Sequence, residues 1–121
     1  MRYLLLIYGN EQAAAAQSAD AQAAEMDAWW KYTSDLQGSG HHLSGEALQP
    51  IATATTVRLT NGRPVVADGP FAETKEQLGG FYMIEVPDLD AAIAWAGKMP
   101  NLPDGGSVEI RPIMELDSSE S

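Results

Sequence analysis

The chain has no cysteine among its 121 residues. Thiol catalysis, zinc–thiolate sites and iron–sulfur clusters are therefore excluded. No apolar run approaches the ~20 residues that a membrane-spanning helix needs. The apolar stretch Tyr3–Tyr8 is too short for the apolar region of a signal peptide, and polar residues follow it from Asn10. We expect an uncleaved, cytoplasmic protein.

Basic residues are also scarce, with seven Lys and Arg against seventeen Asp and Glu and a net charge of −10. Nucleic acid is a polyanion that binds basic surfaces, and anionic membranes likewise attract cations. The composition therefore predicts neither a nucleic acid nor a membrane as partner. A net charge far from zero is sufficiently explained by the solubility of a small domain.

Motifs for several common chemistries are missing as well. The sequence contains no nucleophile elbow, no phosphate-binding glycine loop and no cofactor fingerprint, so we expect no cofactor. The two histidines, His41 and His42, are adjacent and lack partners at metal-ligand spacing. We interpret them as a solvated loop pair and predict no metal site.

Apolar and β-branched runs predict strands at 2–8, 53–59, 65–67, 81–86 and 108–113, with a short extended piece at 45–48. Asn61-Gly62 predicts a hairpin turn between the second and third of these strands. Gly79-Gly80 predicts a bulge or a close backbone approach where the fourth strand starts.

Two helices are expected. The first runs from about Ser18 to Gly38, after an Ala- and Gln-rich stretch that is loop or solvated helix. The second follows Asp88 as its N-cap for about eleven residues. The helical spacing predicts two buried stripes: Met26, Trp29, Trp30, Thr33 and Leu36 in the first helix, and Leu89, Ala92, Ile93 and Ala96 in the second.

This order of elements predicts one α+β domain over residues 1–114, followed by a frayed acidic tail at 115–121. An early and a late helix around a mainly antiparallel sheet fit the ferredoxin-like split βαβ arrangement.

The first strand is apolar on both faces, with Leu5 among the residues of one face and Leu6 on the other. At ~25 cal/mol per Å² of apolar surface, leaving one face of several such strands in water forfeits many kcal/mol. Burial against a second copy about a two-fold axis removes this cost, so we expect a homodimer. A lid formed by residues 11–24 is the alternative.

Residues 68–82 read DGPFAETKEQLGGFY. This segment resembles the signature of the DGPF-motif branch of the YCII-related proteins, and the segments at 1–9, 45–48, 52–58, 87–95 and 107–112 resemble the same family in the same order. The resemblance implies a ferredoxin-like fold that dimerises into an α+β barrel with a cleft. It also implies an association with extracytoplasmic-function sigma factors.

Related YCII proteins include a dehydrochlorinase-type enzyme whose proposed acid–base apparatus is a His–Asp pair, with the histidine on the first helix. The comparable stretch here, Met26–Tyr32, contains no histidine. That dyad chemistry therefore does not carry over to this chain.

The DGPF-like segment supplies the candidate catalytic residues. Asp68 is either the side chain of an Asx-turn or a carboxylate at the cleft rim. Glu73, Lys75 and Glu76 form either a solvated turn with a weak ion pair or an acid–base group in which Lys75 holds an anionic substrate. Tyr82 offers a hydroxyl inside the barrel or a buried contact at the dimer interface.

Glu46 and Arg58 are charged residues in weakly polar surroundings. They are expected either to pair with each other or to bind a carboxylate ligand. Two functions remain open: a small-molecule lyase, isomerase or dehydrochlorinase-type enzyme, and a non-catalytic dimer that senses a ligand or binds a protein such as a sigma factor. The expected ligand is a small organic acid or a phenol.

Overall fold

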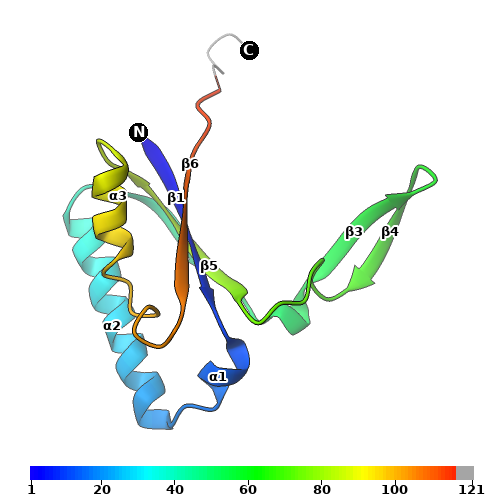
Figure 1. The fold of residues 1–121 in the computed structure, drawn as a ribbon, viewed down its shortest axis with the longest axis horizontal. Coiled ribbons are helices and arrows are strands. Elements are labelled where there is room, and N and C mark those ends of the chain that lie inside the picture. The colour runs from blue at the N-terminus through cyan, green and yellow to red at the C-terminus, as the bar shows by residue number, and fades with distance from the viewer. Residues whose placement is uncertain (117–121) are drawn as a thin grey trace.

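The computed structural model describes residues 1–116 (Figure 1). In chain order the elements are β1 (Arg2–Gly9), α1 (Glu11–Ala15), α2 (Ala19–Gly38), β2 (His42–Ala47), a 3₁₀ turn (Ile51–Thr53), β3 (Thr55–Thr60), β4 (Arg63–Asp68), β5 (Gln77–Glu85), α3 (Leu89–Ala96) and β6 (Ser107–Pro112). No helix in this described part of the chain is long and apolar enough to cross a bilayer.

Four strands form the main sheet in the order β2-β5-β1-β6, and every neighbouring pair is antiparallel. β1 and β2 therefore run parallel with β5 between them, and β5 and β6 run parallel with β1 between them. Helix α2 connects the first of these pairs and α3 the second. Two such interlocked split βαβ units make a ferredoxin-like α+β fold, as predicted.

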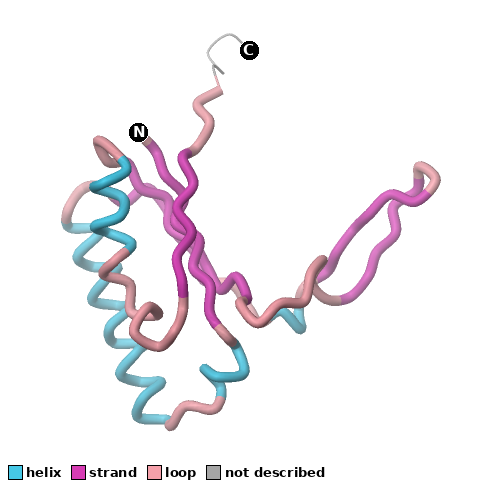
Figure 2. Tube along the Cα trace, in the orientation of Figure 1, coloured by secondary structure: helices cyan, strands magenta, loops and turns pink. Residues whose placement is uncertain are grey.

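Helices α2 and α3 lie on the same side of this sheet, and the β3–β4 hairpin extends away from the other side (Figures 1 and 2). The core lies between the sheet and the helices, and its buried side chains are Tyr3, Leu5, Tyr32, Leu36, Ile84, Val86, Ala92 and Met99. On the opposite face of the sheet, Leu4, Leu6, Phe81 and Met83 remain only half-buried. We call this second surface the open face.

Several local signals are confirmed. The Ser18 hydroxyl accepts a hydrogen bond from the Ala21 amide at 3.1 Å, so it caps α2. Asp88 caps α3 in the same way, at 2.9 Å from the Ala91 amide. Asn61 and Gly62 have φ of 53° and 77° and form the turn between β3 and β4, because a tight hairpin needs this left-handed conformation at both positions.

The buried stripe of α2 differs from the prediction. Tyr32 and Leu36 are buried and Trp29 packs against the core, but Trp30 is 67% exposed and Met26 57% exposed. The core-facing stripe runs through Trp29, Tyr32 and Leu36, and the other two side chains lie to one side of it. The expectation that Trp30 belongs to the core is therefore wrong.

Helix α3 is shorter than expected and buries only its small residues. Ala92 and Ala96 are buried, whereas Leu89 is 48% exposed and Ile93 50% exposed. Because the helix is only eight residues long and packs closely through alanine, its larger apolar side chains lie at the edge of the contact.

β2, β4 and β5 begin before their predicted starts, whereas β3 begins two residues later than predicted, after the 3₁₀ turn. β2 begins at His42, so this histidine is part of a strand and both histidines are half-buried. The interpretation of His41 and His42 as a solvated loop pair is wrong. The register of β1 against β5 shifts between Ile7 and Tyr8, which confirms the irregularity predicted at Gly79-Gly80.

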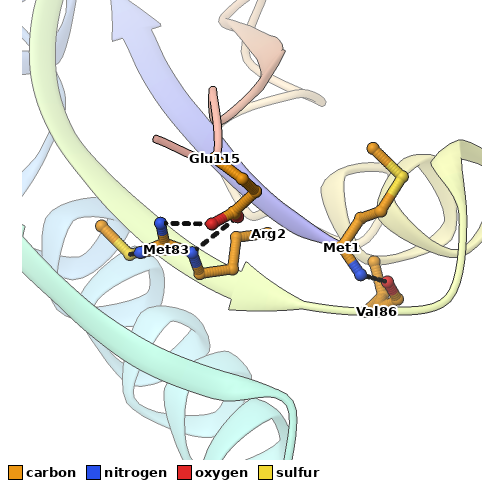
Figure 3. A network of polar contacts seen from close by, with 5 residues as sticks. All are labelled: Met1, Arg2, Met83, Val86 and Glu115. Carbon is orange, nitrogen blue, oxygen red and sulfur yellow. Dashed lines mark hydrogen bonds and ion pairs between the residues drawn. The ribbon is translucent and has the colours of Figure 1, made fainter. Parts of the chain in front are cut away.

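Polar contacts hold the two ends of the domain together (Figure 3). The Arg2 guanidinium donates to both carboxylate oxygens of Glu115 at 2.9 Å, and it also approaches the Met83 sulfur. The terminal amine of Met1 donates to the Val86 carbonyl at 2.8 Å. Glu115, which the sequence assigned to the tail, is thus engaged, while residues 117–121 of that predicted tail lie outside the described residues.

Candidate functional site

A cleft of about 620 Å³ lies between helix α2 and the edge of the sheet formed by β5 and β2. Helix α1 and the loop 101–106 border the end of the cleft, near Gly9 at the end of β1. α2 has twenty residues, which corresponds to about 30 Å of helix, and its two buried residues, Tyr32 and Leu36, both lie in its second half. Its first half therefore reaches beyond the closely packed core and leaves room above the sheet.

Glycine keeps the floor of the cleft open. A Cβ at Gly45 would lie 2.6 Å from Cδ1 of Tyr82, and one at Gly80 would lie 2.8 Å from the Glu46 carbonyl oxygen. Real Cβ atoms do not approach so closely, so both positions need glycine for β2 and β5 to pair as they do. The consequence at Gly45 is that the Tyr82 ring can lie over the neighbouring strand.

Tyr82 is the central side chain of the cleft. Its ring lies 6.4 Å from that of Trp29 in a stacked arrangement, and His42 meets it edge-on with a centroid distance of 6.0 Å. Its hydroxyl forms a short hydrogen bond with Thr33 Oγ1. These contacts fix the ring and place a polar group in a mainly apolar space.

Trp30 and Met26 line the cleft from the flank of α2 that is not packed into the core. Both are more than half exposed. Exposing large apolar side chains to water is unfavourable. A bound apolar molecule would cover these side chains and so gain the free energy of apolar burial.

The charged groups bordering the cleft are acidic. Glu25 on α2 lies beside Asp104, and burial, followed by the hydrogen bond and charge of Asp104, raises the pKa of the Glu25 carboxyl above its usual 4.5. Glu11 and Glu46 also border the cleft, whereas its described lining includes no Lys or Arg. The Glu11 carboxylate accepts from the Ile51 amide at 3.0 Å and so serves a structural contact.

Among the residues predicted from the sequence, the structure places Tyr82 inside the cleft and Glu46 at its border. Tyr82 lies on the helix-covered side of the sheet, away from the open face that the predicted dimer would bury. Asp68 and Arg58 are exposed on the hairpin, where the Arg58 guanidinium donates to the Phe71 carbonyl at 3.2 Å. The structure does not bring Arg58 to Glu46.

The charged trio of the DGPF-like segment is exposed in the loop before β5. The Glu76 carboxylate accepts a hydrogen bond from Ser107 Oγ at 3.3 Å, and the Lys75 carbonyl accepts one from the Asn10 side chain at 3.1 Å. Glu73 is exposed in the same loop. The cleft is therefore not built around the predicted acid–base cluster.

Sequence reasoning did not assign four residues that line the cleft together with Tyr82, which are Glu25, Thr33, His42 and Asp104. They come from one helix, one strand and a distant loop, so no local spacing connects all of them. The one available signal was the pair Trp29-Trp30, because two adjacent tryptophans on a helix cannot both point into one core.

Comparison with known proteins gives a consistent assignment. The model of the YCII-related domain matches residues 1–117. An uncharacterised protein of Rhizobium meliloti (strain 1021) is 37% identical over 114 residues, which cover 93% of this chain and 92% of that protein. The chain, with its ferredoxin-like sheet and its cleft beside α2, belongs to the family of YCII-related domain proteins.

Proposed function

We propose that this protein binds a small, neutral aromatic molecule of the phenol class in the cleft between α2 and the sheet. The observation that carries the proposal is the arrangement around Tyr82. Stacked and edge-on aromatic rings surround one hydroxyl pair, Tyr82 with Thr33, in a cleft of a size typical for small-molecule sites.

The exposed side chains support an apolar ligand. Trp30 and Met26 form an uncovered apolar wall, and a flat ring inserted beside them would remove this surface from water at ~25 cal/mol per Å². The hydroxyl pair would orient the polar end of the ligand, because a buried polar group needs a hydrogen-bond partner.

Charge favours a neutral phenol over an organic acid. The Glu25 and Asp104 residues border the cleft, and its described lining offers no Lys or Arg to hold a carboxylate. An anionic ligand would therefore meet like charges on entering.

Thermal unfolding of the chain with phenol and, separately, with benzoate tests the proposal. A ligand at tenfold its Kd stabilises the folded state by about 1.4 kcal/mol, or a rise of roughly 5 °C in Tm for a domain of this size. We expect phenol to raise the Tm and benzoate, which has a similar shape but a negative charge, to have a much smaller effect.

Trp30→Ala should weaken phenol binding at least tenfold while leaving the Tm of the free protein nearly unchanged, because this side chain lines the cleft but is not packed. Phe71→Ala is the matched control, since Phe71 is a 78% exposed aromatic residue outside the cleft lining. Equal loss in both variants, or none in Trp30→Ala, would contradict the proposed site.

Acid–base catalysis of a lyase, isomerase or dehydrochlorinase type has less support. Among the five candidate catalytic residues, Tyr82 is the one in the described cleft lining. Binding without turnover is therefore the function that the geometry favours. We propose on the motif at residues 68–82 that the chain belongs to the DGPF branch. A link to a sigma factor is a prediction that follows from this resemblance.

We further infer that the chain forms a homodimer through the open face. Leu4, Leu6, Phe81 and Met83 leave an apolar surface half-exposed on the side of the sheet without helices. Sedimentation equilibrium measures this directly, and a single species of about 13 kDa at all accessible concentrations would reject the dimer.

A further inference from the structure

The two adjacent histidines lie in different surroundings. The His41 ring meets Trp95 edge-on with a centroid distance of 6.4 Å, and its Nδ1 lies 2.9 Å from the Glu85 carbonyl oxygen. The His42 ring lines the cleft and meets the ring of Tyr82. His41 is not among the described residues of that lining. One histidine therefore belongs to the edge of the core and the other to the candidate site.

A bulge in β2 places His42 on the cleft side of the sheet. Gly45 lies opposite Tyr82, on the side that α2 covers (Figure 2). Regular alternation from Gly45 would put the side chain two positions earlier on that side and His42 on the open face. The register shifts between His42 and Ser44, so His42 lies opposite the buried Ile84 instead. Bulges re-aim side chains in this way, and here the bulge gives the cleft an imidazole.

The His42 ring has polar atoms that the chain does not use. Within residues 1–116, which the structure describes, no group hydrogen-bonds its ring nitrogens, whereas the Tyr82 and Thr33 hydroxyls bond to each other. The side chain is also half-buried, so water reaches only part of the ring. A polar group in this position gains from a ligand that completes its hydrogen bonding.

The surroundings favour a ligand that donates. A neutral imidazole has one nitrogen that accepts a hydrogen bond. The charged residues of the described lining are acidic, and carboxylates only accept. Asn101 also lines the cleft, and its Oδ1 is a buried acceptor without a partner in the described chain. The ligand that suits these groups carries its own hydrogen-bond donor, as a phenol does and an aryl ether does not.

We propose that His42 holds the hydroxyl of the bound phenol. Its unprotonated ring nitrogen accepts the hydroxyl hydrogen beside Tyr82, while the ring of the ligand packs against the apolar wall of Trp30 and Met26. This inference rests on the proposed function and names the residue that determines its selectivity. The ligand class narrows to aromatic molecules with a free hydroxyl.

Calorimetric titration with phenol and with anisole tests the role of His42. Anisole carries a methyl group in place of the hydroxyl hydrogen, so it keeps the ring and the oxygen but cannot donate. The parent chain should bind phenol roughly tenfold more tightly than anisole, and His42→Phe should bind the two within about twofold. His41→Phe is the matched control and should keep the preference of the parent chain, because that ring lies outside the described cleft lining.

The ¹⁵N resonances of the imidazole rings give a second readout that needs no variant. At equal saturation, phenol should shift the unprotonated nitrogen of His42 more than anisole does, and the ring nitrogens of His41 should stay in place. If phenol binds but His42→Phe keeps the preference for it, or the His42 nitrogen responds equally to both ligands, the role of His42 is overturned and the binding function stands. If phenol does not bind the parent chain, both fail.

Discussion

Tyr82 shows how one side chain can depend on several distant parts of a chain. Its ring is fixed by Trp29 and Tyr32 from α2 and by His42 from β2, and its hydroxyl by Thr33. Tyr32 packs beside Tyr82 and is buried. This burial, and to a smaller extent the proximity of Tyr82, raises the pKa of the Tyr32 hydroxyl. Tyr32 therefore stays a neutral hydrogen-bond donor at physiological pH, and its hydroxyl donates to the Trp95 carbonyl at 2.9 Å.

The pair Glu25 and Asp104 gives a pH-dependent prediction at this scale. Because the pKa of Glu25 is raised in the folded state, its contribution to stability is complete below the usual 4.5 and is lost as the pH rises through the raised value. Glu25→Gln should therefore gain stability relative to the parent chain between about pH 4 and neutrality.

Denaturant unfolding at a series of pH values measures this difference. Glu115→Gln serves as a comparison of opposite sign, because Arg2 lowers the pKa of Glu115 and the parent chain should lose that contribution as the pH falls. A stability difference for Glu25→Gln that does not change with pH would contradict the raised pKa that burial and Asp104 give to Glu25.

At the scale of elements, the sequence predicted what local chemistry determines. Ser18 was recognised as the approximate start of a helix, Asp88 as a cap and Asn61-Gly62 as a turn, because each depends on its own backbone neighbours. The cleft was not predicted, because it arises where α2 reaches past the packed core. Trp30 has the helical spacing expected of a core residue, but it lies to one side of the stripe formed by Trp29, Tyr32 and Leu36 and stays exposed.

The pairing of β2 with β5 gives a prediction about one of these elements. Gly45→Ala should destabilise the fold by about 1–3 kcal/mol and displace the Tyr82 ring, since the new Cβ would lie 2.6 Å from that ring. Gly38→Ala, at the end of α2, is the control: a Cβ there meets nothing within 4 Å, so no loss is expected.

Chemical denaturation measures both stabilities, and phenol titration of Gly45→Ala measures the site. If Gly45→Ala is as stable as the parent chain and binds phenol equally well, the close approach of the two strands does not position Tyr82.

For the molecule as a whole, two surfaces are left apolar on one chain: the open face of the sheet and one face of the β3–β4 hairpin. The two apolar faces of β1 and the β3–β4 hairpin itself were predicted, but the separation of this hairpin from the main sheet was not. Its sequence has the alternation of an ordinary half-buried hairpin, and nothing local indicates that β3 and β4 would leave the main sheet. The helix-covered side of the sheet, by contrast, holds both the core and the cleft.

The three tryptophans allow the most direct test of the cleft as the binding site. Trp29 and Trp30 line it, whereas Trp95 packs edge-on against Tyr32, under the Lys98 ammonium, outside the cleft lining. In an NMR titration with phenol we expect the indole resonances of Trp29 and Trp30 to shift and saturate together while that of Trp95 stays in place. Equal movement of all three indoles, or movement of Trp95 alone, would contradict the account.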